Sequence, residues 1–432
     1  MAKTFRPYDP DQMLLMPPSL ADWVPEDHVA RFVRDVVEAL DLTAIEETYT
    51  EERGYPPYDP RMMVGVLLYA YCSGTYSARK IAAKLVDSVA FRFLAAGNQP
   101  DFRTISEFRR RHGEALAALF TQGLRLCRQA GLVKLGRVAI DGTKIKANAS
   151  KHKAMSYGRM KTQEAMLEQE VRGLLRQAEA ADREDDTRYG RDRRGDELPA
   201  ELARRESRLA KIREAKAALE AEARARAQAD GQPPDDVVPT DKAQRNFTDP
   251  EAKIQKTSDG FIQGYNAQIA VDSGPAQIIV AQHVTPAAPD VQQLVPAVAA
   301  ITAGLHRKPG SVLADAGYCS EANIVALEAK GIEPFIATGR RKHTEPIPVA
   351  PRGRLADGLS AKERMARKLL TRRGHAIYAR RKAIVEPVFG QIKHARGFRQ
   401  FLRRGLVRVQ EEWALICLSH NLLKLHTATI GD

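Results

Sequence analysis

The spacing of apolar and polar positions changes several times along this chain of 432 residues. In its first third the apolar positions recur at helical spacing, which predicts helices. Asp59 before a proline marks the start of one helix and Gly74 marks its end. The pattern Thr104-Ile-Ser-Glu107 predicts a capping box that opens a longer, basic helix. The predicted helices span 60–73, 77–85 and 88–95, and a fourth begins at 104.

Between Met160 and Ala229 the composition shifts to Ala, Glu, Arg, Lys, Gln and Leu, and apolar residues recur at helical spacing in two runs. Breakers at Tyr189-Gly190 and at Gly195 separate the runs, which predicts a helical hairpin. The spaced residues are Leu167, Val171, Leu174 and Ala178, then Leu202, Leu209, Ile212, Ala215 and Leu219. A dimer contact or a DNA-positioning arm explains the hairpin as well as a solvated insertion does, because the mixed charge pattern suits both.

After the hairpin, apolar and polar residues alternate, which is the spacing typical of strands. Residues 261–271 and 277–284 alternate around Asp272-Ser-Gly-Pro, which predicts a β-hairpin. The predicted order continues as helix 290–305, strand 312–314, helix 321–330 with a Ser320 cap, strand 333–337 and a final helix 409–426. Strands that later alternate with helices are typical of a mixed α/β domain. We therefore expect an all-α N-terminal region, then an α/β domain that the helical hairpin interrupts.

The charge of the chain indicates what kind of partner it binds. The chain holds 67 Lys and Arg against 54 Asp and Glu, a net charge of +13, which favours nucleic acid over a membrane surface. The stretch 340–408 alone contains 20 basic and 4 acidic residues, which predicts salt-dependent binding to phosphates. The N-terminus lacks the apolar core of a signal peptide, and residues 413–425 are too short and polar to span a bilayer. We therefore expect a cytoplasmic protein without a membrane partner.

Two common site types are not indicated. The 4 cysteines lie far apart without a nearby His pattern, so we expect reduced packing residues rather than a zinc site or a disulfide framework. No Gly-rich loop of the nucleotide-hydrolase kind is present in the sequence, so ATP is not implied.

Three carboxylates stand out against this background. Asp141 closes one apolar run and Asp315 closes another, so each is predicted at the carboxyl end of a buried strand. Glu386 lies later, among Lys and Arg. Acids that converge inside a basic surface repel one another unless divalent cations neutralise them, and oxygen ligands of this kind suit Mg²⁺ or Mn²⁺. Metal between carboxylates, beside a phosphate-binding surface, indicates phosphodiester chemistry.

The order Asp…Asp…Glu, with Ala-Ile-Asp141-Gly-Thr, Ala-Asp315-Ala-Gly-Tyr and a late Tyr…Arg…Glu…Lys cluster, resembles the DDE transposases of bacterial insertion sequences. The resemblance covers most of the chain. It implies a ribonuclease H-like catalytic domain in which Asp141, Asp315 and Glu386 hold two Mg²⁺ or Mn²⁺ ions and carry catalysis.

The resemblance also implies DNA contacts from the late cluster. These residues are Tyr378, Arg381, Lys382 and Lys393. The family places Arg four and Tyr seven residues before the Glu, whereas Lys382 and Ala379 occupy those places here. Arg381 and Tyr378 each lie one residue further from the Glu.

The predicted domains are 1–135, a helical DNA-binding domain; 136–432, the catalytic domain; and 155–235, the helical hairpin inserted into it. Arg109, Arg110 and Arg111 lie on the basic helix of the first domain, where DNA contacts compete with the alternative of solvated side chains on a compact bundle. The resemblance implies an enzyme that binds element ends, cleaves them and joins them to target DNA, as a homodimer or higher assembly on the bacterial nucleoid. A nuclease of the same fold and a transposase that only binds DNA are the competing hypotheses.

The identity of the second metal ligand and the course of the chain at Glu386 each have more than one explanation. Asp272 and Asp290 compete with Asp315 as the second metal ligand. A turn explains Asp272 and a helix N-cap explains Asp290, whereas neither explains Asp315, so we predict Asp315. Glu386 precedes a proline, so either a helix starts there or a longer helix kinks. In a continuing helix Lys393 shares the face of Glu386.

Overall fold

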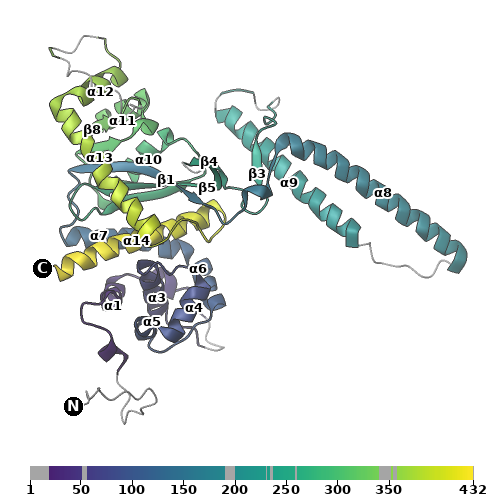
Figure 1. Ribbon diagram of the computed structural model, residues 1–432, viewed down its shortest axis with the longest axis horizontal. Helices are drawn as coiled ribbons and strands as arrows, with labels where there is room; N and C mark the ends of the chain where they lie inside the picture. Colours follow the sequence, from purple (N-terminus) through teal and green to yellow (C-terminus); the bar gives the residue numbers. More distant parts are fainter. Residues whose placement is uncertain are drawn as a thin grey trace, which may run out of the picture. The chain divides into compact units, whose positions relative to one another are not determined.

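The computed structural model describes residues 19–50, 56–189, 200–229, 231–233, 237–257, 260–339, 352–353 and 358–431, without the side chains from 177 to 202. The chain divides into two compact units, which Figure 1 draws with their elements. One combines Met1–Val133, Gly274–Ile278 and Leu415–Asp432, and the other combines Lys134–Ser273 and Ile279–Ala414. The hairpin breakers at Gly190 and Gly195 and part of the basic stretch 340–408 lie outside the described residues.

Within the described residues, the regular elements of the first unit are all helices, as predicted for this region. They are the 3-10 turn η1 Leu20–Trp23 and helices α1 Val29–Ala39, α2 Thr43–Glu46, α3 Pro60–Cys72, α4 Ala78–Asp87, α5 Val89–Leu94, α6 Phe102–Arg111 and α7 Gly113–Gln129, with the end of α14 Leu406–Ile430. The predicted helix start at Asp59 is confirmed. Its carboxylate accepts the backbone N–H groups of Arg61 and Met62 at 2.7 and 3.1 Å.

Helix α6 begins earlier than the capping-box pattern predicts. Its N-cap is Asp101, whose carboxylate accepts the backbone N–H of Thr104 at 2.7 Å. The capping-box prediction is therefore wrong. An acidic acceptor three residues upstream already caps the amide of Thr104, which places Thr104 inside the helix. Glu107 forms an ion pair with Arg110 one turn further on.

A six-stranded sheet forms the core of the second unit (Figure 1). Its order is β4 Lys253–Thr257, β5 Gly260–Asp272, β1 Arg137–Lys146, β7 Ser311–Ala314 and β8 Glu333–Ile336, with β6 Ile279–Thr285 also paired to β5. β5 pairs antiparallel with β1, β4 and β6, whereas β1, β7 and β8 are parallel. Three antiparallel strands β6, β5 and β1, continued by two parallel strands, make a ribonuclease H-like sheet. The mixed α/β prediction is confirmed.

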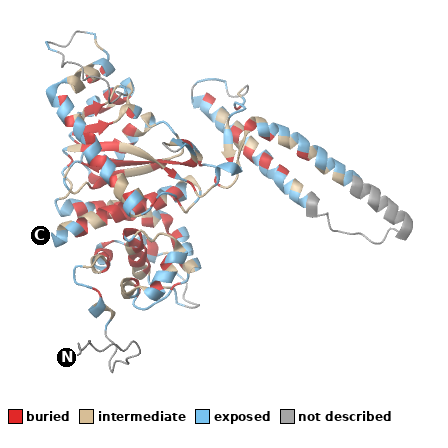
Figure 2. Ribbon diagram, in the orientation of Figure 1, coloured by how far each residue is buried: buried red, intermediate tan, exposed pale blue. Residues whose placement is uncertain are grey.

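Helices cover the sheet. Helix α13 Arg372–Gly390 packs against β1, β5, β7 and β8, and α10 Leu294–Leu305 packs against β5 and β6. Figure 1 shows α13 crossing the strands, and Figure 2 shows that the strand residues beneath it are largely buried. Val385 and Val388 of α13 are fully buried, so the helix is held on the sheet by apolar packing. α11 Glu321–Ala329 starts at the predicted Ser320 cap.

Strand β1 extends beyond the point where the apolar run ends. It continues past Asp141 to Lys146, and each of these residues pairs with β5, as in the partnership of Lys146 with Gly264. The prediction that Asp141 closes a strand is therefore wrong. The parallel pairing with β7 does stop there, since its last pair is Ile140 with Ala314. Asp315 follows the end of β7 as predicted.

Two long helices form the predicted hairpin. They are α8 Tyr157–Tyr189 and α9 Ala200–Ala229, with the short strands β2 Ala154–Ser156 and β3 Gln244–Asn246 paired at their base. Figure 2 shows buried residues along the facing sides of the two helices. The buried cluster comprises Tyr157, Met160, Leu167, Leu209, Ile212, Ala215 and Leu219. The predicted residues Leu167, Leu209, Ile212, Ala215 and Leu219 thus lie in the interface between α8 and α9. The predicted Val171 and Leu174 are only partly buried, and the side chains of Ala178 and Leu202 lie outside the described residues.

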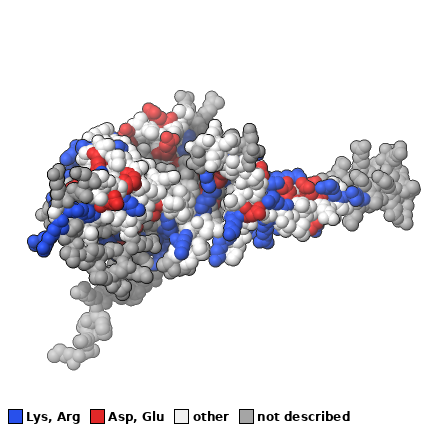
Figure 3. Space-filling model, turned by 90° about the horizontal axis from the view of Figure 1, so that it is seen from above, with Lys and Arg blue, Asp and Glu red and all other residues white. Residues whose placement is uncertain are grey.

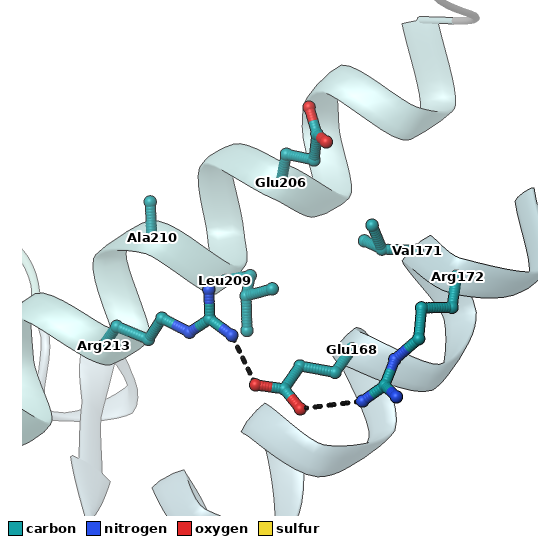
Figure 4. Close-up of a pocket in the computed structure, with 7 residues that line it drawn as sticks. All are labelled: Glu168, Val171, Arg172, Glu206, Leu209, Ala210 and Arg213. Carbon is teal, nitrogen blue, oxygen red and sulfur yellow. Dashed lines mark hydrogen bonds and ion pairs between the residues drawn. The ribbon is translucent and has the colours of Figure 1, made fainter. Parts of the chain in front are cut away.

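Charges of both signs alternate on the outside of this hairpin (Figure 3). Glu164 pairs with Arg213 at 3.2 Å and with Lys216 at 2.8 Å, each time across the two helices. A hollow of about 530 Å³ between the helices is lined in part by Glu168, which accepts hydrogen bonds from Arg172 and Arg213 (Figure 4). Matched charges of this kind do not make a phosphate track.

The C-terminal elements are α12 Ala361–Leu370, α13, the π-helical turn η5 Gln391–Ala395 and α14. Pro387 lies inside α13, so the alternative that a helix starts at Glu386 is wrong. The helix starts instead after Thr371, whose side chain caps it by accepting the backbone N–H of Gly374 at 3.0 Å. The helix continues past Pro387 because Val385 and Val388 on either side of it are buried against the sheet. Among the described helices, none is long and apolar enough to cross a membrane.

Candidate active site

Asp141 and Asp315 lie beside each other on neighbouring parallel strands. Ile140 of β1 is in register with Ala314 of β7, and the two aspartates are the next residues. The Asp141 carboxylate accepts the backbone N–H of Gly142 at 2.8 Å, and the Asp315 carboxylate accepts that of Gly317 at 2.8 Å. The sheet therefore brings together two residues that are far apart in the sequence.

The environment of Asp141 disfavours its negative charge. Burial raises the pKa of Asp141 to about 6, the Arg381 guanidinium lowers it in part, and the charge of Asp315 raises it again. Arg381 donates to the Asp141 carboxylate at 2.7 Å, and the two side chains are 9% and 20% exposed. The Nε atom of Arg381 is buried without a hydrogen-bond partner among the described residues. The incompletely bonded Arg381 thus faces the two carboxylates, with the Lys144 ammonium group also near them, and further positive charge there would be stabilised.

Asp290 also belongs to this region, and the N-cap explanation for it is wrong. It precedes the short turn η3 Val291–Gln293 but makes no capping hydrogen bond. Its carboxylate accepts instead from Asn266 Nδ2 at 2.6 Å and from Gln268 Nε2 at 2.7 Å, and Lys144 Nζ lies 3.8 Å away. The two amides come from β5, so tertiary structure rather than local capping fixes this carboxylate.

Two glycines leave space for these carboxylates. A Cβ built on Gly317 would lie 3.0 Å from Asp315 Oδ1 and 3.3 Å from Asp290 Oδ2. A Cβ on Gly142 would lie 2.2 Å from Gln268 Nε2 and 3.0 Å from Asp290 Oδ1. The close approach of these side chains therefore explains the glycines at positions 142 and 317.

The remaining competitor, Asp272, lies outside this group. It is buried at the end of β5, and its carboxylate accepts the backbone N–H of Leu135 at 2.6 Å. It fixes the chain just before β1.

Sequence reasoning missed the polar network behind the aspartates. Asn266 and Gln268 are buried on β5, and the Tyr318 hydroxyl donates to Gln268. The signal was present, because Asn and Gln at alternate positions of an otherwise apolar strand place two amides on one face. Lys144 was missed as well, although it follows Asp141 by three residues.

The residues of the late cluster lie at different depths. Arg381 is buried against Asp141, and Tyr378 is partly buried, with its pKa raised by burial. Lys393 Nζ donates to Thr143 Oγ1 at 2.9 Å and to the Lys144 carbonyl at 3.2 Å. Lys382 is exposed on α13.

Glu386 is not gathered with the two aspartates. It is exposed on α13 and, within the described residues, forms no hydrogen bond or ion pair. The described part of the chain also contains no group of three His, Cys, Asp or Glu side chains arranged to hold a metal ion. The geometry therefore provides an aspartate pair, and the third predicted ligand stands apart from it.

The three arginines predicted to contact DNA in the first unit also differ. Arg109 is buried and donates to the Tyr76 carbonyl at 2.8 Å. Arg110 pairs with a carboxylate on its own helix, as described above. Arg111 donates to the Thr48 carbonyl and is exposed. Arg110 and Arg111 are thus accessible to a phosphate, whereas Arg109 serves internal packing.

Comparison with known proteins gave two matches. Residues 18–111 match the family described as Transposase domain (DUF772), and residues 235–422 match the family described as Transposase DDE domain. The second range includes Asp315 and Glu386, whereas Asp141 precedes it on the other side of the hairpin. Searches of curated proteins and of solved structures gave no match.

Proposed function

The chain is a DDE transposase of the insertion-sequence type, an enzyme that acts on DNA, and from this premise we propose its chemistry. It binds the terminal inverted repeats of its element, cleaves phosphodiester bonds with two divalent metal ions, and joins the 3′ ends to target DNA. The observation that carries this proposal is the partly buried aspartate pair Asp141 and Asp315 on adjacent parallel strands.

The donor set fits the divalent cations that this family generally uses. Both groups are carboxylates, which are the ligands that Mg²⁺ and Mn²⁺ prefer, and the charge of Asp315 disfavours a negative charge on Asp141. Asp141 and Asp315 would hold the metal, with Glu386 as the proposed third ligand. When bound, divalent ions at such sites activate the attacking oxygen and neutralise charge on the leaving oxygen.

The chain's own residues position the DNA. Arg381 holds the Asp141 carboxylate in place. Lys393, fixed by Thr143, presents its ammonium group beside β1 for a phosphate oxygen, and Tyr378 and Lys382 contact the same strand. Water attacks the phosphorus at the element end and the bond to the 3′ oxygen breaks. The freed 3′-hydroxyl then attacks a target phosphorus and expels the 3′ oxygen of the target strand.

Recognition of the ends is assigned to the helical region 1–135, with Arg110 and Arg111 on its surface. The region 136–432 carries the chemistry, and the hairpin 155–235 is an insertion in it. Specificity needs base contacts, whereas clustered Lys and Arg supply mainly phosphate contacts. Two element ends must be paired in one complex, so a homodimer or larger assembly is the proposed active form.

The test uses a labelled duplex that carries one element end, with Mg²⁺ or Mn²⁺ and target DNA. We expect cleaved and joined products, and we expect Asp141→Ala to lower cleavage by about 10³-fold or more while DNA binding survives, because this carboxylate serves the reaction rather than affinity. Cleavage without joining would instead identify a nuclease. Full activity in excess chelator would contradict the metal chemistry.

A further inference from the structure

A groove of about 840 Å³ lies in the second unit beyond the aspartate pair. Its walls come from the end of β1, the short 3-10 turn η2 Lys151–Lys153, the β4–β5 hairpin and the segment that follows α13. Its cationic lining residues are Lys144, Lys146, Lys151, Lys393 and Arg399, and none of the lining residues that the structure describes is acidic. We call this feature the basic groove.

Hydrogen bonds between the end of β1 and residues 399–401 hold the floor of the basic groove together. The Lys146 N–H donates to the Arg399 carbonyl at 3.3 Å, and the Phe401 N–H donates to the Lys146 carbonyl at 2.9 Å. Gln400 Nε2 also donates to the Ala147 carbonyl at 3.1 Å. The last residues of β1 are thus joined to the segment after α13, so cations from distant parts of the sequence are held together.

The positive charge of the basic groove is largely unbalanced. Within the described part of the chain, Lys146, Lys151, Lys393 and Arg399 form no ion pair, and Lys144 has Asp290 at 3.8 Å. Burial and, second, the charge of Arg399 lower the pKa of Lys393. Like charges held this close are costly unless an anion lies between them. A polyanion whose charges repeat along its length suits such an elongated arrangement.

Phe261 adds an apolar wall. This residue is 62% exposed although it is the second residue of β5, the longest strand of the sheet, and it lines the basic groove. An exposed aromatic ring beside unpaired cations is typical of surfaces that hold nucleic acid, where the ring contacts a sugar or a base and the cations contact phosphates.

We propose that the basic groove binds the DNA backbone that flanks the scissile phosphate, with Lys146, Lys151 and Arg399 on successive phosphates and Phe261 against a sugar or base. The location follows from the chain itself: Lys144 lies three residues beyond Asp141, and Lys393 bonds to Thr143 between them. The inference rests on the proposed function and adds where the DNA runs on the catalytic unit.

The test measures DNA affinity of the full chain against salt concentration, in chelator, with a duplex that carries an element end. Lys146→Gln with Lys151→Gln removes two exposed cations. We expect about 10-fold weaker binding, and a slope of log affinity against log salt that is smaller by about 2, because each lost phosphate contact releases one counterion fewer. Phe261→Ala should weaken binding without changing the slope.

The matched control is Lys134→Gln with Lys330→Gln, which makes the same change of net charge at exposed lysines of the same unit, outside the basic groove and outside the stretch 340–408. An equal loss of slope in the control, or an unchanged slope in the groove variant, would overturn the proposal. Unchanged fluorescence of the buried Trp413 would show that the variants fold. If the wild-type chain neither cleaves nor joins DNA while the groove variant still lowers the slope, the proposed function fails and the groove assignment stands.

Discussion

Replacing Asp141 by Asn is expected to stabilise the second unit at neutral pH. The folded state raises the pKa of this carboxyl from 3.8 to about 6, so it binds its proton more tightly when folded than when unfolded. The wild type therefore loses stability as the pH rises from about 4 to about 6, and it does not regain that stability above pH 6. Asn cannot ionise and avoids this loss. At about 1.4 kcal/mol for each pKa unit, the difference at neutral pH is about 3 kcal/mol.

The assay is urea unfolding in chelator, followed by fluorescence of Trp413, which is buried in the second unit. A Trp23→Phe background removes the other tryptophan, which is 54% exposed in the first unit. The free energy of unfolding of Asp141→Asn relative to wild type should increase by about 2 kcal/mol between about pH 4.5 and about pH 7.5. Asp241→Asn is the matched control, because this side chain is 72% exposed.

The opposite result would refute this reasoning. If Asp141→Asn is less stable than wild type at neutral pH, then the ion pair with Arg381 outweighs the burial of the carboxylate and its repulsion by Asp315. A difference that does not change with pH would mean that Asp141 titrates normally.

Two further predictions concern packing and polar contacts. Asp290→Ala removes the Oδ1 atom that accepts from both Asn266 and Gln268, so we expect a loss of about 1–3 kcal/mol in the same urea assay. A much smaller loss in stability would mean a minor role for this carboxylate. Gly123→Ala puts a Cβ 2.3 Å from Leu418 Cδ1 within the first unit, and thermal unfolding should show about 1–3 kcal/mol of destabilisation from overpacking, whereas an unchanged midpoint would mean that Leu418 moves aside freely.

Local chemistry made the helix starts at Asp59 and Ser320 predictable, because a single side chain caps each of them. Local chemistry did not predict the start of α6. Asp101 and Thr104 can both cap a helix, and the sequence alone does not show which of them the helix uses. The end of β1 was mispredicted for a different reason. The apolar run stops at Ile140, but pairing with β5 continues through polar residues whose partners lie far along the chain.

For the candidate active site, too, the sequence predicts local features but not contacts between residues that lie far apart in the sequence. The adjacency of Asp141 and Asp315 could be expected from two apolar runs that each end in an acid, since neighbouring parallel strands bring such ends together. The partners of Asp290 could not, because they lie more than twenty residues away on β5. The orientation of Glu386 depends on α13 continuing through a proline, which helix rules disfavour and which packing against the sheet overrides.

The most direct test of the account replaces each aspartate by cysteine and measures cleavage of an element-end duplex in Mg²⁺ and in Mn²⁺. A thiolate is a poor ligand for Mg²⁺ and a better one for Mn²⁺. If Asp141 and Asp315 hold the metal, Asp141→Cys and Asp315→Cys should be inactive in Mg²⁺ and regain cleavage in Mn²⁺, whereas Asp290→Cys should show no such difference between metals. Recovery in Mn²⁺ by Asp290→Cys, with Asp315→Cys inactive in both metals, would contradict the assignment of the aspartate pair.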